Sequence, residues 1–122
     1  MTIIGPGASV IEVNGNHRSQ VFSVNGSASP LTISGLTIAN GYPTDGQGGG
    51  IRVSRPAVAN LTDVVVEDNT ATAAGGNYSE GGGIFSQGTL TLTRYTVRNN
   101  AVNGGVLAAV AGAFTASGAR SR

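Results

Sequence analysis

Apolar and polar residues alternate in three segments of the chain, and these segments align with one another without gaps. They cover residues 31–40, 59–68 and 90–99. Each reads apolar–polar–apolar, then a short break, then a second triplet of the same kind, with Val65 in place of the polar residue in the second segment. Because successive side chains of a strand point to opposite faces, each triplet predicts a short strand with two inward apolar residues.

A glycine motif predicts a third strand in each repeat. Gly-Gly-Gly-Ile occurs at residues 48–51 and 81–84, before the second and third aligned segments, and residues 20–24 take its place before the first. Glycine triplets suit positions where the backbone bends or packs closely. Three strands per repeat predict a three-sided coil, and repeated coils predict an all-β protein, a parallel β-helix (solenoid) of about three to four coils.

Stacked coils in this register predict continuous apolar columns inside the solenoid. Neighbouring coils would lie about 4.8 Å apart, so that equivalent side chains touch along the stack. The predicted columns are Ile33/Leu61/Leu92, Leu36/Val64/Tyr95 and Ile38/Val66/Val97.

An antiparallel sandwich is the competing fold, because the chain has four Asn-Gly pairs, at residues 14–15, 25–26, 40–41 and 103–104. Asn-Gly indicates a hairpin when alternating apolar residues flank it on both sides. Here the second flank is usually missing, as after Gly15, where four polar residues follow. The pairs therefore indicate corners of a solenoid more than hairpins.

The coils are expected to occupy residues 1–105, and residues 106–122 to form a degenerate coil or an irregular tail. Residues 106–114 are apolar but do not alternate. A weak helix, a degenerate coil and a truncated or frame-shifted tail all fit this segment. Its alanine content favours the helix slightly.

Composition and charge argue against several classes of function. Charged residues make up 11% of the chain, the net charge is +1, and the arginines are scattered. A nucleic-acid-binding protein would need a basic stripe, so no nucleic-acid partner is predicted. Cysteine is absent, which excludes disulfides and cysteine-based metal sites, and no metal or cofactor is predicted. No signal peptide opens the chain, and the longest apolar run is too short to span a bilayer.

Two pairs of opposite charge are predicted on the outside of the solenoid, where Arg94 lies over Asp63 and Arg98 over Glu67. Such cross-strand pairs are ordinary stabilising contacts. An alternative function is a fragment of a carbohydrate-active β-helix enzyme, a polysaccharide lyase or hydrolase, in which acids flank a glycosidic bond. Its candidate residues are these four and Asp68. We assign no catalytic residue, because lyases of this kind add lysine and usually a calcium cluster, and the sequence supplies neither.

Other polar residues predict structural contacts and a possible binding surface. Asn40, Asp68 and Asn99 form one column and are predicted to hydrogen-bond backbone amides at a corner. Loops at residues 41–47 and 69–80 would leave the stack along one edge, where solenoids often bind partners. The candidate contact residues there are Tyr42, Asp45, Tyr78 and Glu80.

The glycine motifs, with Val-Glu-Asp-Asn at residues 66–69 and Val-Arg-Asn-Asn at 97–100, resemble the repeats of right-handed parallel β-helix proteins. The nearest type is the passengers of polymorphic outer-membrane proteins and autotransporter adhesins. Those passengers repeat a Gly-Gly-Ala-apolar motif and an aromatic-x-x-Asn motif. Here glycine stands in place of the alanine, and Val66 and Val97 in place of the aromatic residue.

This resemblance covers about residues 1–105, and it implies a right-handed, single-stranded solenoid. It also implies a structural or interaction segment of a secreted or cell-surface (outer-membrane) protein with an adhesion-like role. The expected partners are a host or cell-surface protein or glycan, and further coils of the same polypeptide. A signal for export would lie outside this chain.

Overall fold

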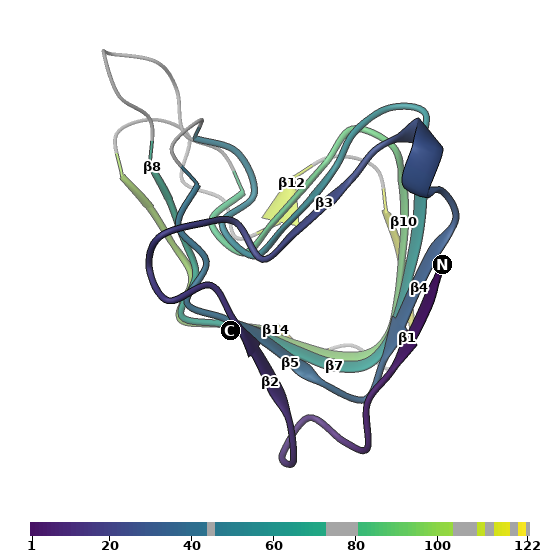
Figure 1. The fold of residues 1–122 in the computed structure, drawn as a ribbon, viewed down its shortest axis with the longest axis horizontal. Coiled ribbons are helices and arrows are strands. Elements are labelled where there is room, and N and C mark those ends of the chain that lie inside the picture. The colour runs from purple at the N-terminus through teal and green to yellow at the C-terminus, as the bar shows by residue number, and fades with distance from the viewer. Residues whose placement is uncertain (44–45, 73–80, 104–109, 112–113, 118–119, 122) are drawn as a thin grey trace.

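The computed structural model describes residues 1–43, 46–72, 81–103, 110–111, 114–117 and 120–121. The chain winds into an all-β parallel solenoid of about three turns. In Figure 1 it turns clockwise as it recedes from the viewer, so the solenoid is right-handed. The fold predicted from the alternating pattern is confirmed.

Each turn has three sides. The strands of the first side are β1 (Thr2–Ile4), β4 (Leu31–Ser34), β7 (Val58–Glu67), β10 (Thr89–Arg98) and β13 (Phe114–Ser117). The second side contains β2 (Glu12–Asn14), β5 (Thr37–Ala39), the later halves of β7 and β10, and β14 (Arg120–Ser121). The third contains β3 (Phe22–Val24), β6 (Ile51–Val53), β9 (Ile84–Ser86) and β12 (Val110–Ala111). A separate pair, β8 (Thr70–Thr72) and β11 (Ala101–Asn103), extends from one corner, and a 3₁₀ turn spans Gly26–Ala28.

All strand pairs in the described residues are parallel, which excludes the antiparallel sandwich for this part of the chain. The predicted register is also confirmed. Leu61 pairs with Ile33 on one side and with Leu92 on the other. Val66 lies in the same way between Ile38 and Val97.

The first corner depends on a left-handed backbone conformation. Gly35 has φ 68° there, and Asp63 and Arg94 occupy the same position in the next two turns with φ 54° and 48°. Glycine adopts this conformation without steric cost, and aspartate tolerates it better than most residues. A single residue in this conformation reverses the alternation of side chains, so the next residue again points inward.

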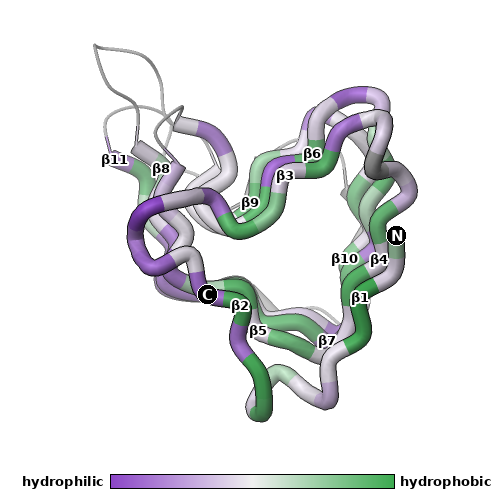
Figure 2. The backbone as a smooth tube through the Cα atoms, viewed as in Figure 1, coloured by the Kyte–Doolittle hydropathy of each residue, from purple (hydrophilic) through white to green (hydrophobic). Residues whose placement is uncertain are grey.

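The apolar columns form a closed aliphatic core. Ile33, Leu61, Leu92, Val66 and Val97 are fully buried. Figure 2 shows hydrophobic residues along all three sides, and hydrophilic residues mainly at corners and connecting segments. The core therefore runs along the axis of the solenoid.

The described tail residues form strands, so the slight preference for a helix is wrong for them. β13 and β14 pair with β10, and β12 pairs with β9. The edge of β10 offers a row of backbone donors and acceptors. Pairing with it satisfies more hydrogen bonds than a short isolated helix would, because helix nucleation is costly.

Candidate functional site

The first candidate site is the corner where Asp63 and Arg94 stack. Arg94 donates from Nε to Asp63 Oδ1 (2.7 Å) and from Nη2 to Oδ2 (3.0 Å), a bidentate ion pair. Both side chains remain more than half exposed. The pairing predicted from the sequence is confirmed. It links two turns at a corner where both residues adopt the left-handed backbone conformation, which neither aspartate nor arginine prefers.

Hydrogen bonding from Arg94 lowers the pKa of Asp63 below its ordinary value of 3.8. A carboxylate with a lowered pKa in the folded state stabilises the fold above its unfolded-state pKa, and this contribution disappears as the pH falls through the lower folded value. A general acid needs the opposite shift. Asp63 is therefore suited to an ion pair and not to protonating a glycosidic oxygen.

We expect Asp63→Asn to destabilise the protein at pH 7 and the difference from wild type to vanish as the pH falls through the lowered pKa of Asp63. Urea unfolding measured from pH 7 down to well below 3.8, the ordinary pKa of aspartate, follows this change. Asp68→Asn is the matched control, because Asp68 is an exposed carboxylate outside the two ion pairs. A pH-independent difference between wild type and Asp63→Asn would contradict the ion-pair explanation.

The second predicted pair also forms. Arg98 Nε donates to Glu67 Oε2 at 2.6 Å. The structure thus brings four of the five candidate enzyme residues together as two salt bridges, and Asp68 lies exposed one residue after β7. Cross-strand ion pairs of this kind stabilise the stacked turns by themselves, so these contacts do not favour the enzyme over the structural interpretation.

Of the four candidate contact residues, only Tyr42 lies in the described part of the chain. It is half-buried, and its backbone N–H donates to the carbonyl of Ser19 at 2.9 Å. Asp45, Tyr78 and Glu80 lie outside the described residues, so the predicted contact surface stays a prediction.

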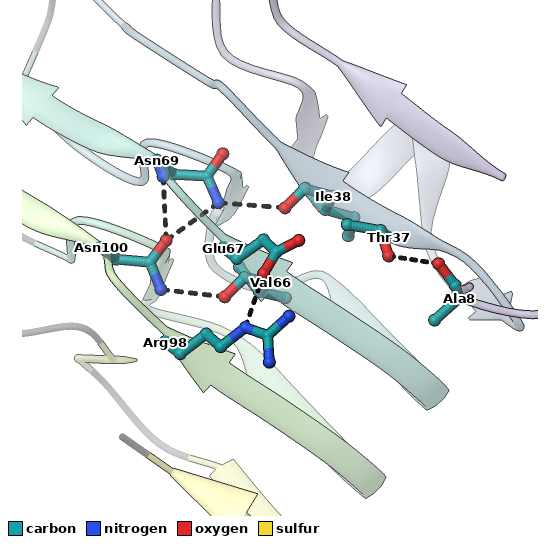
Figure 3. A network of polar contacts seen from close by, with 8 residues as sticks. All are labelled: Ala8, Thr37, Ile38, Val66, Glu67, Asn69, Arg98 and Asn100. Carbon is teal, nitrogen blue, oxygen red and sulfur yellow. Dashed lines mark hydrogen bonds and ion pairs between the residues drawn. The ribbon is translucent and has the colours of Figure 1, made fainter. Parts of the chain in front are cut away.

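A ladder of asparagines holds the second corner together (Figure 3). Asn69 accepts a hydrogen bond from Gly41 N (2.8 Å), and its Nδ2 donates to the carbonyl of Ile38 (3.1 Å) and to Asn100 Oδ1 (3.0 Å). Asn100 Nδ2 in turn donates to the carbonyl of Val66 (3.0 Å). Each asparagine therefore satisfies backbone groups of the preceding turn, a structural role.

Asn40, Asp68 and Asn99 occupy equivalent positions as predicted, but the hydrogen bonds predicted for this column are made one residue later, by Asn69 and Asn100. Asn40, Asp68 and Asn99 are the left-handed corner residues, with φ between 54° and 56°. Asp68 and Asn99 are exposed, whereas the following residue points into the corner. The alternation restarts after a left-handed residue, so the hydrogen-bonding side chain is the next one along the chain.

The sequence analysis missed a polar strip on the first side, which we call the hydroxyl face. Two outward columns make it up, separated by the inward column that contains Ile33. One column contains Thr2, Thr32, Asn60 and Thr91. The other begins with the apolar Ile4 in the first turn and continues with Ser34, Thr62 and Thr93. None of these residues is charged, and within the described part of the chain their side chains make no hydrogen bond to the protein.

The described residues hold no group of three histidines or acids that could bind a metal ion. They also include no helix long and apolar enough to cross a membrane. Comparisons of the chain with protein-family models, curated proteins and solved structures found no match. The resemblance to surface passengers therefore depends on the short repeat motifs alone.

Proposed function

We propose that this chain is a structural and interaction segment of a secreted or cell-surface protein, with an adhesion-like role, and that its hydroxyl face binds a glycan. The observation that carries the proposal is the uncharged row of hydroxyl and amide groups. These groups both donate and accept hydrogen bonds, as the hydroxyls of a sugar do.

The geometry of the hydroxyl face supports an extended ligand. Successive turns repeat at about 4.8 Å, which is close to the length of one sugar unit in an extended glycan chain. The inward neighbours of this face are fully buried aliphatic residues such as Leu61 and Leu92. They hold the strands rigid, so that little conformational freedom is lost on binding.

Export and surface location belong to the same proposal. The glycine motifs and the Val-x-x-Asn segments support it, because they resemble the Gly-Gly-Ala-apolar and aromatic-x-x-Asn motifs that secreted β-helix passengers repeat. A rigid solenoid with polar outer sides also suits the shaft of an adhesin, since it exposes an extended surface without a catalytic centre.

A double substitution, Thr62→Val with Thr93→Val, tests the glycan site. Valine keeps the shape and β propensity of threonine but removes the hydroxyl. We expect affinity to fall by about tenfold or more, because each lost hydrogen bond contributes about 1 kcal/mol. Binding is measured by calorimetry against soluble cello-oligosaccharides, mannan and polygalacturonate.

Thr70→Val with Thr96→Val is the matched control, because both threonines are half-buried strand residues away from the hydroxyl face. This variant should bind as wild type does. Wild-type protein that binds none of the glycans, or equal losses in the two variants, would overturn the proposal. Cleavage of polygalacturonate that is abolished by Asp68→Ala in a folded protein would favour the enzyme instead.

A further inference from the structure

The first turn leaves the apolar columns uncovered at one end of the solenoid. In the second turn, Ile33 is fully buried and Leu36 is 2% exposed. Their neighbours in the first turn are Ile3, which is only half-buried, and Ile11, which is 46% exposed. The core is thus closed along its sides and open at this end.

Further apolar side chains gather at the same end. Met1, Ile4, Val10 and Ile11 are the exposed large hydrophobic residues among those whose burial is described, which lie within residues 1–103. Single exposed apolar residues are common on protein surfaces, but a group of them marks an interface. The segment between β1 and β2, which contains Val10, projects sideways from the stack and does not cover its end (Figure 1).

The strands at this end also have unpaired backbone groups along their outer edges. β1 pairs only with β4: Gly5 N donates to Ser34 O at 2.8 Å and Thr32 N to Met1 O at 2.9 Å. Because backbone groups alternate between the two edges of a strand, the N–H and C=O of Ile4 point away from β4.

The same holds on the third side of the turn. Phe22 N donates to Gly50 O and Ser54 N to Val24 O, so the backbone of Ser23 faces the open edge of β3. Neither β1 nor β3 contains the lysine or proline by which natural proteins protect an edge strand.

We propose that this end binds a second copy of the chain, head to tail, with the first turn of one copy stacked on the last turn of the next. On the second side, β2 likewise pairs only with β5. The opposite end of the described stack has open edges on the same three sides, because β13 and β14 pair only with β10, and β12 only with β9. A head-to-tail copy continues the parallel strands on all three sides and covers the apolar columns. This inference is independent of the glycan proposal.

The shape of the cross-section excludes the two-fold alternative. A copy related by a two-fold axis would present its outline reversed. The outline in Figure 1 has no mirror symmetry, because β8 and β11 extend from one corner only. Face-to-face contact would therefore pair one side at most. Head-to-tail contacts do not close, so the expected product is a filament one molecule wide. A net charge of +1 offers little repulsion against it.

Sedimentation velocity of the 122-residue chain over a range of concentrations, with electron microscopy, tests the proposal. We expect particles that grow with concentration into single-file filaments. Ile4→Lys combined with Ser23→Lys should raise the concentration at which assembly begins by about tenfold or more, because a lysine on an edge strand opposes pairing with a further strand. Thr62→Lys is the control for charge, since Thr62 lies in the column of Ile4 but two turns inside the stack.

Three results would overturn the proposal. The first is a wild-type monomer at every concentration, and the second is a dimer that does not grow. The third is equal inhibition by Thr62→Lys and by the two end substitutions. Far-UV circular dichroism of each variant, compared with wild type, separates loss of assembly from loss of folding.

Discussion

Gly49→Ala is expected to lower the free energy of unfolding by about 3 kcal/mol or more, among the largest effects of a single methyl group in this chain. A Cβ atom at Gly49 would overlap the carbonyl oxygen of Gly82 and lie 2.9 Å from the backbone N of Thr70. Both neighbours are backbone atoms of stacked turns. No side-chain rotation relieves the overlap, so the turns themselves would have to separate.

Urea unfolding followed by circular dichroism measures this effect. Gly26→Ala is the matched control, because the nearest atom to its added Cβ is Pro56 Cδ at 3.8 Å, an ordinary contact. We expect that variant to stay within about 0.5 kcal/mol of wild type. If Gly49→Ala were equally stable, close packing of the glycine backbones would not be a determinant of the fold.

The glycine motifs show what the sequence can and cannot specify. A run of three glycines predicts either a bend or a close backbone approach, and the structure uses both. Gly48 and Gly81 take positive φ values of 66° and 61°, which makes the bend. Gly49 and Gly82 are close-packed between turns. Which glycine does which depends on the neighbouring turn, and that is not a local property of the sequence.

The columns and ion pairs were predictable because they depend only on alternation and on the length of the repeat. Once residues 59–68 and 90–99 are aligned, Leu92 must lie over Leu61 and Arg98 over Glu67, as the structure shows. The asparagine ladder was not predictable in this way. The direction of Asn69 is fixed by the left-handed conformation of Asp68, and alternation alone does not reveal that conformation.

The three aligned segments already place six residues of the hydroxyl face in two outward columns, but the first turn lacks the repeat pattern, so Thr2 could not be added to them. β1 and β2 are separated by residues 5–11, whereas only residues 35–36 separate β4 from β5. Without coordinates, Thr2 cannot be placed in register with Thr32.

Asn69→Ala is expected to destabilise the protein by about 3 kcal/mol, although it removes only a small polar group. Asn69 is fully buried, and its side chain satisfies the N–H of Gly41 and the carbonyl of Ile38. Each buried backbone group left without a partner costs about 1–3 kcal/mol. Asn100→Ala should cost less, because Asn100 is half-buried and water can replace its hydrogen bonds.

Asn69→Leu separates hydrogen bonding from packing. Leucine has the same branched outline of four side-chain heavy atoms as asparagine but makes no hydrogen bond, so it should destabilise the protein at least as much as alanine does if the ladder acts through its hydrogen bonds. Asp68→Asn, at the exposed neighbouring position, should change the unfolding free energy little, within about 0.5 kcal/mol. A leucine variant that is as stable as wild type would mean that Asn69 only fills space, and the corner would then depend on the glycine contacts and strand pairing alone.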